Sequence, residues 1–425
     1  MNKIKILLVV VVLVFVAGIT TTAEAANNDK RIADLEASLK VMQTELAQLK
    51  TQQVPVDQKK LDTMVSKMLE EKKADMKLVP NWVETFKFKG DLRYRHEWAD
   101  NEAGNTADRN RHMIRARFGF DAKVNDEVDV GFRLSTGGNT NPASRNQTLD
   151  NSFSSKGIYL DLAYADYHPA AIENLHIVGG KMNNPFFKTG SNELMFDADL
   201  TPEGGAIIYK RKLSENLTGF GTLGAFYLEE RTNDDGDTSM WAAQAGVKYD
   251  VPGAEKTYVK AGAGFYDYGN IENFSLANGS ALGNTLDGSN NYANDFDIVQ
   301  VFGEVGFPIG DLPGKVFAEY IDNTGASSKS TGYIIGTSIG KCKKPGNWQF
   351  TYSYRDVQAD ATVGFLNDGT FANGETDSKG HTISLGYQLA KNLKLCGTYA
   401  MAERAVSTSS SSDHDAALID LVFKF

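Results

Sequence analysis

Residues Thr85 to Trp98, with the sequence TFKFKGDLRYRHEW, alternate between apolar and charged side chains. Successive side chains of a β-strand point to opposite faces, so this period of two predicts a strand with one apolar and one charged face. The apolar face would carry Phe86, Phe88, Leu92, Tyr94 and Trp98, and the charged face Lys87, Lys89, Asp91, Arg93, Arg95 and Glu97. A soluble sheet does not readily bury so charged a face, whereas a water-filled lumen keeps it solvated. The stretch therefore predicts a membrane-spanning strand with lipid on one side and water on the other.

The same pattern recurs along the chain. In Arg111 to Val124, the residues Ile114, Ala116, Phe118, Phe120 and Val124 alternate with Arg111, Arg115, Arg117, Asp121 and Lys123. In all we count about sixteen such segments, most of them close to the roughly 9–11 residues that a tilted strand needs to cross a bilayer. Tight turns alternate with long connections rich in Gly, Asn, Ser and Asp. The sequence predicts an all-β transmembrane fold, a 16-stranded antiparallel β-barrel over residues 85–425, and a barrel of about that size encloses an aqueous channel.

The chain ends on the alternating stretch Asp415 to Phe425, DAALIDLVFKF. It resembles the closing strand of bacterial outer-membrane β-barrels, in which the assembly machinery reads a C-terminal aromatic residue. The resemblance implies that Phe425 is an assembly signal and that the barrel-assembly machinery, outer-membrane lipid and lipopolysaccharide are partners. It places the protein in the bacterial outer membrane.

The first residues have the pattern of a cleaved signal peptide. Lys3 and Lys5 precede the apolar run Ile6 to Ala17, and Ala23-Glu24-Ala25 has the small-x-small form of a cleavage site. We therefore predict a signal peptide over residues 1–25. The net charge of −10 and the lack of a basic tract argue against nucleic acid as a partner.

Residues 26–50 contain a heptad pattern that predicts a short α-helical coiled coil in the periplasm. Its segment Arg31 to Glu36 resembles the Arg-h-x-x-h-Glu pattern (h apolar) of three-stranded coiled coils, which implies a homotrimer. The predicted trimerisation residues are Arg31, Ile32, Leu35, Glu36, Leu39, Met42, Leu46 and Leu49. A helix packed on its own domain and a marginal free helix are the alternatives. Residues 51–84 are expected to form a linker and a second short helix.

The long connection 183–204, NNPFFKTGSNELMFDADLTPEG, carries more bulky apolar residues than a water-exposed loop would hold. We expect it to fold into the barrel, pack its apolar side on the wall and present Glu193, Asp197 and Asp199 to the lumen. The expected basic residues opposite are Lys87, Lys89, Arg93, Arg95, Arg111, Arg115, Arg117 and Arg133. Opposed charges across a constriction would favour small polar solutes and tune ion preference. Alternatively, many of these charges form salt bridges along the wall, and Asp197 and Asp199 hold the shape of a turn.

Three short motifs around this connection resemble one family. Gly180-Lys181-Met182, Asn184-Pro185-Phe186 and the run FDADLTPEG from Phe196 to Gly204 are similar to the "Putative porin" family of Gram-negative bacteria. The resemblance implies a porin barrel preceded by a signal peptide and a coiled coil. It implies no particular solute.

Motifs for chemistry are lacking in the sequence. The six histidines have no metal-ligand spacing, and no Gly-x-Ser-x-Gly nucleophile motif occurs. We therefore expect no enzymatic activity, no metal and no cofactor. The predicted function is passive diffusion of small hydrophilic solutes and ions through a pore. A substrate-specific channel and a structural tether from the outer membrane to peptidoglycan are the alternatives.

Overall fold

The computed structural model describes Lys40 and residues 85–425, apart from 101–107, 139, 233–235, 277–280 and 410. The predicted signal peptide and the linker with its short helix lie outside the described residues, as does the coiled coil except for Lys40. The barrel belongs to the compact unit Val79–Phe425. Among the described residues, no helix is long and apolar enough to cross a membrane.

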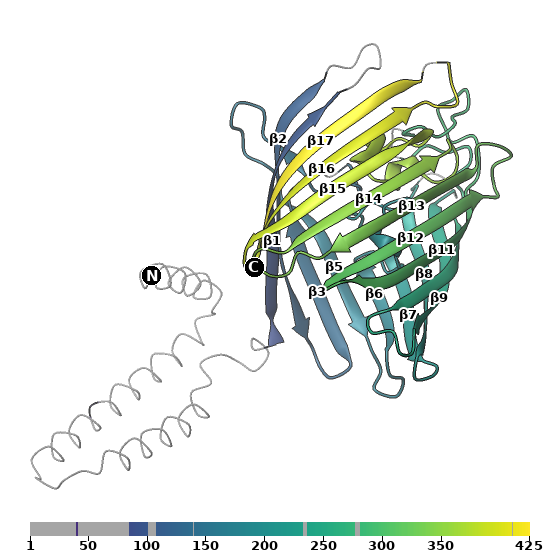
Figure 1. Ribbon diagram of the computed structural model, residues 1–425. Coiled ribbons are helices and arrows are strands. Elements are labelled where there is room, and N and C mark those ends of the chain that lie inside the picture. Colours follow the sequence, from purple (N-terminus) through teal and green to yellow (C-terminus); the bar gives the residue numbers. More distant parts are fainter. Residues whose placement is uncertain are drawn as a thin grey trace, which may run out of the picture. The chain divides into compact units, whose positions relative to one another are not determined.

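Seventeen strands are found in the described part of the chain, and sixteen of them form a closed antiparallel barrel (Figure 1). The strands are β1 (Lys87–Ala99), β2 (Arg109–Lys123), β3 (Val128–Ser135), β4 (Gln147–Thr148), β5 (Tyr159–Tyr167), β6 (Leu175–Lys181), β7 (Glu203–Lys212), β8 (Leu217–Glu229), β9 (Thr238–Asp250), β10 (Tyr258–Asp267), β11 (Asp297–Ile309), β12 (Leu312–Asn323), β13 (Thr331–Gly340), β14 (Trp348–Val357), β15 (Ser378–Ala390), β16 (Leu393–Arg404) and β17 (Ser412–Lys424). Pairing of β17 with β1 closes the barrel, with Asp91 opposite Lys424 and Ala99 opposite Ala416. The predicted barrel is confirmed.

The additional strand is β4, which the sequence analysis did not predict. It has two residues and pairs with β2 inside the connection between β3 and β5. Three short 3₁₀ helices also lie within connections: η3 (Thr189–Ser191), η4 (Gly364–Leu366) and η5 (Phe371–Gly374).

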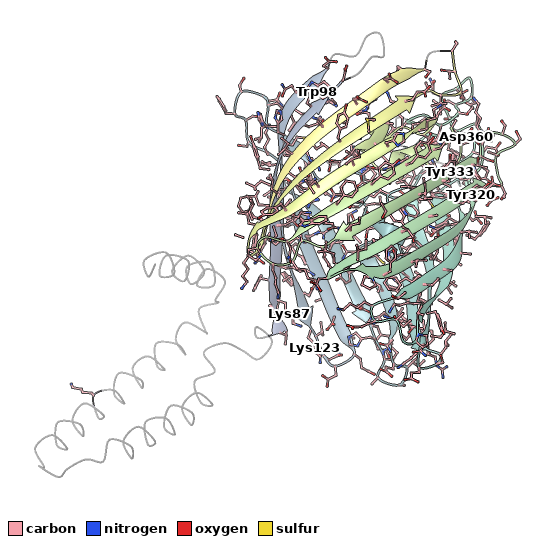
Figure 2. The ribbon with its side chains drawn as sticks, in the orientation of Figure 1. Lys87, Trp98, Lys123, Tyr320, Tyr333 and Asp360 are labelled. Carbon is pink, nitrogen blue, oxygen red and sulfur yellow. The ribbon has the colours of Figure 1, made fainter. Side chains whose placement is uncertain are left out.

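The connections alternate in length, as the sequence pattern indicates. Short turns such as 124–127, 213–216 and 391–392 link strands at one end of the barrel, and long segments such as 136–158, 182–202 and 268–296 link them at the other. Lys87 and Lys123 lie at the short-turn end, and Trp98 lies at the long-connection end (Figure 2).

Side chains alternate between the outer and inner faces of the wall. On β1, Phe88 is 62% exposed on the outside, whereas Arg95 is 8% exposed on the inside. Tyr320 on β12 and Tyr333 on β13 stand opposite each other and are likewise exposed on the outer face (Figure 2). Because the outer face carries the large apolar and aromatic residues, it suits contact with lipid.

A hydrophobic cluster fills part of the barrel interior. It joins inward side chains of β8 to β13 with residues of three connections, 182–202, 268–296 and 358–377. Tyr268, Ile271 and Val363, from the second and third of these connections, are fully buried. From the sequence, inward packing is expected for the connection 182–202 only. The connections 268–296 and 358–377 have the composition of polar loops.

Candidate pore constriction

Two glycines stand at the base of the connection 182–202. Gly180 on β6 pairs with Gly204 on β7, and their φ angles are +121° and +153°. A Cβ atom would lie 2.3 Å from the carbonyl oxygen of Ala163 at the first position and 2.1 Å from that of Ala225 at the second. Only glycine fits both the backbone conformation and this close approach. The chain can therefore leave β6 and re-enter at β7 without disturbing the neighbouring strands.

The connection packs its apolar side on the inner wall. Phe186 and Phe196 lie with their ring centroids 5.1 Å and 5.6 Å from that of Tyr266 on β10. Leu194 is fully buried and Met195 nearly so. These side chains remove apolar surface from water on both the connection and the wall, which stabilises the inward position.

Polar groups of the wall hold the same connection at its turn. The Gly190 amide donates to Glu304 Oε2 at 2.8 Å, and the Asn192 side chain donates to Glu319 Oε2 at 2.7 Å. The Phe187 amide donates to Gln244 Oε1 at 2.8 Å. The buried carboxylates of β11 and β12 thus accept hydrogen bonds from the connection, as buried charges must to remain in a protein interior.

Asp199 reaches across to the basic side of the lumen. Its Oδ1 lies 2.8 Å from Arg115 Nη1 and 3.3 Å from Arg117 Nη1, and both arginines also pair with Asp91. Burial alone would raise the pKa of Asp199, but Arg115, Arg93 and Arg117 outweigh it and hold the pKa below its usual range. Asp199 is therefore an ionised carboxylate that ties the connection to β2.

Glu193 and Asp197 lie apart from this basic side. Glu193 accepts a hydrogen bond from the Ala198 amide at 2.9 Å, and Asp197 accepts one from the Asp199 amide at 2.6 Å. The Asp197 bond is of the turn-holding kind that the sequence suggests as an alternative role for Asp197 and Asp199. The carboxylates of Glu193 and Asp197 also lie beside Asp368, and oxygen atoms of all three groups are within 4.8 Å of one another.

All but one of the remaining basic residues of the predicted wall, Lys87 being the exception, have a polar partner of their own among the residues that the structure describes. Arg95 makes two hydrogen bonds to Asp420, at 2.6 and 2.7 Å, and Arg133 pairs with Asp161 at 2.6 Å. Arg111 pairs with Glu97, and Arg93 donates to Asn146. Lys89 pairs with Asp121, and Lys87 lies near the short-turn end of β1 (Figure 2). The structure therefore brings only Arg115 and Arg117 into direct contact with the predicted acids.

A cavity of about 510 Å³ lies between these groups. It is lined by six arginines and five carboxylates: Arg93, Arg95, Arg109, Arg111, Arg115, Arg355, Glu97, Glu193, Asp197, Asp199 and Asp368. Lys87, Lys89, Arg117 and Arg133 do not line it. Most of its arginines come from β1 and β2 and most of its acids from the connections 182–202 and 358–377, while Glu97 lies on β1 and Arg355 on β14.

Four charged residues of this region, of which Arg109 on β2 is one, were not identified from the sequence. Arg145, in the connection between β3 and β5, donates from Nε to Asp161 and from its backbone amide to Asp199. Arg355 on β14 pairs with Asp368 at 2.5 Å. The signal that points to Asp368 is the apolar content of TVGFLNDGTF, residues 362–371, which resembles that of the connection 183–204.

A closed barrel with a charged cavity bounded by inward connections defines a membrane channel. The family model described as "Putative porin" matches residues 98–293 and 285–425, so the chain belongs to this family. The protein is accordingly an outer-membrane porin that allows passive diffusion. The family and the fold are those of channel proteins.

Solved porin structures have a similar fold at low sequence identity. Salmonella typhi OmpF in complex with daunomycin has 12% identity and a TM-score of 0.49, covering 80% of this chain and 97% of OmpF. The outer-membrane channel DcaP of Acinetobacter baumannii has 16% identity and a TM-score of 0.46, with coverage of 80% and 97%. A triple mutant of the Rhodopseudomonas blastica porin has 11% identity and a TM-score of 0.45, with coverage of 80% and 100%. No curated protein has a sequence that matches this chain.

Proposed function

We propose that small hydrophilic solutes and ions diffuse through the cavity between the arginines of β1 and β2 and the acidic connection 182–202. The observation that carries this proposal is the placement of Asp199, which bridges the connection to Arg115 and Arg117 at the edge of that cavity. The connection would narrow the pore, and Glu193, Asp197 and Asp199 would form its acidic side.

The charge pattern supports a filter based on polarity and size. Arg93, Arg95, Arg111 and Arg115 line one side of the cavity, and acids line the other, so a transverse field would act on solutes between them. An apolar solute gains nothing from this field and would have to displace water that solvates the charges. Lys87, Lys89, Arg117 and Arg133 would line the path outside the cavity.

Planar-bilayer recording tests this function. The purified full chain should insert as discrete, stable conductance steps, and flux of small sugars into liposomes should rise linearly with concentration. Saturation of that flux at low concentration would favour a substrate-specific channel instead. Failure to conduct ions at all would contradict the proposal.

We also propose that three copies assemble and that residues 26–50 lie in the periplasm. The heptad positions Ile32, Leu39 and Leu46 support the assembly. The outer face of the barrel offers a second support, because His96, His112 and Tyr94 project from β1 and β2, with Tyr94 Oη 2.7 Å from His112 Nδ1. Such polar groups are costly against lipid, so contact with another copy would shield them.

Removal of residues 26–84 from the mature chain tests the assembly. Crosslinking of the intact protein in detergent should give trimers, and the shortened protein should give fewer of them. Pull-down with purified peptidoglycan shows in the same samples whether this region also tethers the membrane. A monomeric intact protein would contradict the trimer.

A third element of the proposal is that Phe425 serves as the assembly signal. Its backbone pairs with that of Gly90 on β1, so it belongs to the seam that closes the barrel. Phe425→Ala should lower the amount of folded barrel in the outer membrane, whereas Phe423→Ala, two residues earlier, should lower it less. Equal effects of the two changes would contradict a terminal signal.

A further inference from the structure

The connection 358–377, between β14 and β15, lies inside the barrel. The Asn284 side chain donates to the carbonyl oxygens of Ala359 and Thr362 at 2.6 and 2.8 Å, and it accepts from the Gly364 amide at 2.8 Å. Asn323 donates to the Asp360 carbonyl oxygen at 2.8 Å. Both asparagines are buried, so these hydrogen bonds fix the connection 358–377 to the neighbouring connection 268–296 and to the end of β12.

The connections 182–202 and 358–377 are joined by two hydrogen bonds, one between main-chain groups and one to a side chain. The Asp197 amide donates to the Leu366 carbonyl oxygen at 2.9 Å, and the Gly369 amide donates to Asp197 Oδ2 at 3.2 Å. Because of this contact, Asp368 lies next to Glu193 and Asp197. The result is a group of three carboxylates, Glu193, Asp197 and Asp368, which we call the acidic trio.

The acidic trio has fewer neighbouring cations than carboxylates. Arg355 on β14 pairs with Asp368 at 2.5 Å and is 5% exposed, and two of its buried nitrogens, Nε and Nη1, have no hydrogen-bond partner. Lys188 acts on Glu193 from within the connection 182–202, while its Nζ donates to the Phe196 carbonyl oxygen at 3.0 Å. The other charged groups that face this region are Asp199 in the same connection, Arg93 and Arg115 on β1 and β2, and Glu304 and Glu319 on β11 and β12.

Carboxylate charges at this separation repel one another, so a charged neighbour favours the protonated form of Glu193 and of Asp197. Burial, with the charge of Asp368 added to it, raises the pKa of Glu193 to about 7. Burial and the charge of Glu193 raise the pKa of Asp197 well above its usual value. Asp199 is different, since its arginine partners keep it ionised.

We propose that Asp368 is a further selectivity residue of the pore and that its charge, placed beside Glu193 and Asp197, favours proton binding by these two carboxylates, so that anion preference falls as pH rises through neutrality. The inference rests on the proposed function, because it concerns the charge of the same cavity. Six arginines and five carboxylates line that cavity, so its formal charge is one positive when all are ionised. One bound proton doubles this net charge.

Reversal potentials in a salt gradient test the inference. The chloride-to-potassium permeability ratio of the full chain is measured in planar bilayers in the presence of EDTA, so that divalent cations do not contribute. The ratio is expected to fall about threefold between about pH 5 and about pH 9 as Glu193 and Asp197 lose their protons. Asp368→Asn and Glu193→Gln, tested separately, should each remove at least half of this response.

A control variant and a second measurement keep the outcomes distinct. Asp126→Asn changes an aspartate whose side chain is 98% exposed in a short turn, and it should keep the full response. Heat-modifiability on gels shows whether each variant is folded. If Asp368→Asn does not fold, the pH response of the permeability ratio in Glu193→Gln alone tests the inference. Normal conductance with a pH-independent ratio would overturn the inference and leave the proposed function intact. An unchanged pH response in both folded variants would also overturn it, whereas a lack of conductance would sink the proposed function itself.

Discussion

The inner wall of this barrel has two unlike halves. On β1, β2 and β3 the inward side chains include Arg95, Arg115 and Arg133, each paired with a carboxylate. On β8 to β13 they include Phe226, Tyr266 and Ile298, which are covered by the inward connections. We call these the charged half and the apolar half.

The residue types on an inward face therefore depend on whether that face borders water or folded chain. Both halves are built from the same period of two, with lipid outside, but Arg95 and Arg115 of the charged half line the cavity, whereas most of the apolar half packs against folded chain. Without the connections 182–202 and 358–377, the apolar half would expose a large apolar surface to water. The inward connections are therefore part of the fold as well as candidate parts of the pore.

The largest effect is expected from weakening the apolar half at Phe196, which is 4% exposed. Phe196→Ala should lower the free energy of unfolding by about 4 kcal/mol, because it leaves a cavity under the connection 182–202. A loosened connection should also raise single-channel conductance and its noise. Phe118→Ala, on the outer face of β2, is the matched control and should leave conductance unchanged. Equal conductance of the two variants would show that the connection does not limit the pore.

The charged half is tested next by Arg115→Gln. This change leaves Asp91 and Asp199 with one arginine in place of two, and loss of a buried ion-pair partner costs about 3 kcal/mol. It should also shift the permeability ratio toward cations. Lys89→Gln breaks an exposed ion pair with Asp121 and should cost less than about 1 kcal/mol. Denaturant unfolding of the three proteins compares them, and similar losses in both variants would contradict the division of the wall.

A smaller effect is expected where the connection touches the wall at Gly190. Its φ is +60°, and a Cβ atom would lie 2.3 Å from Cδ1 of Phe317 on β12. Gly190→Ala should cost about 2 kcal/mol more than Gly253→Ala, through overpacking. Gly253 also has a positive φ, +75°, but open space around it, so the backbone strain of the two changes is similar. Thermal unfolding in detergent measures the difference in stability between the two variants. Equal stability would mean that the connection can shift away from Phe317 to make room for the added methyl group.

The smallest expected effect is a pH dependence of stability from Glu193. Its pKa is raised to about 7 from a usual value of 4.5, so the folded state binds more protons between these values. The free energy of unfolding should therefore fall as pH rises through this window and level off above it. Asp199 acts in the opposite direction, because its lowered pKa stabilises the fold above the usual value and that contribution is lost in strong acid. Glu193→Gln should reduce the slope between about pH 5 and about pH 7, and an unchanged slope in the folded variant would contradict the assignment.

The strands could be predicted from the sequence because the alternation of apolar and polar side chains within each strand reflects its lipid-facing and inward-facing sides. The alternation in Lys87–Ala99 requires no knowledge of its neighbours, and the inward packing of Phe186 and Phe196 follows from their excess over what a wet loop would hold. The strand β4 has two residues, too few to show any period.

The partners within the site depend on contacts between distant segments. Asp368 meets Glu193 because Asn284 of the connection 268–296 and Asn323 at the end of β12 hold the connection 358–377 in place. The polar residues of that connection also mask Val363 and Phe371, which are buried in the structure. No local pattern carries the information that Arg115 and Arg117, rather than Lys87 or Lys89, would meet Asp199.

Cysteine accessibility on β14 tests the central claim, that one face of these strands borders water and the other borders lipid. Ser353 lines the cavity, whereas Tyr352 is its neighbour on the outer face. With Cys342 and Cys396 replaced by serine, Ser353→Cys and Tyr352→Cys are treated with a charged, membrane-impermeant thiol reagent during bilayer recording. If Ser353 faces water and Tyr352 faces lipid, Ser353→Cys should be modified rapidly and its conductance should drop. Tyr352→Cys should show neither effect. The reverse pattern, or equal modification of both, would contradict the central claim.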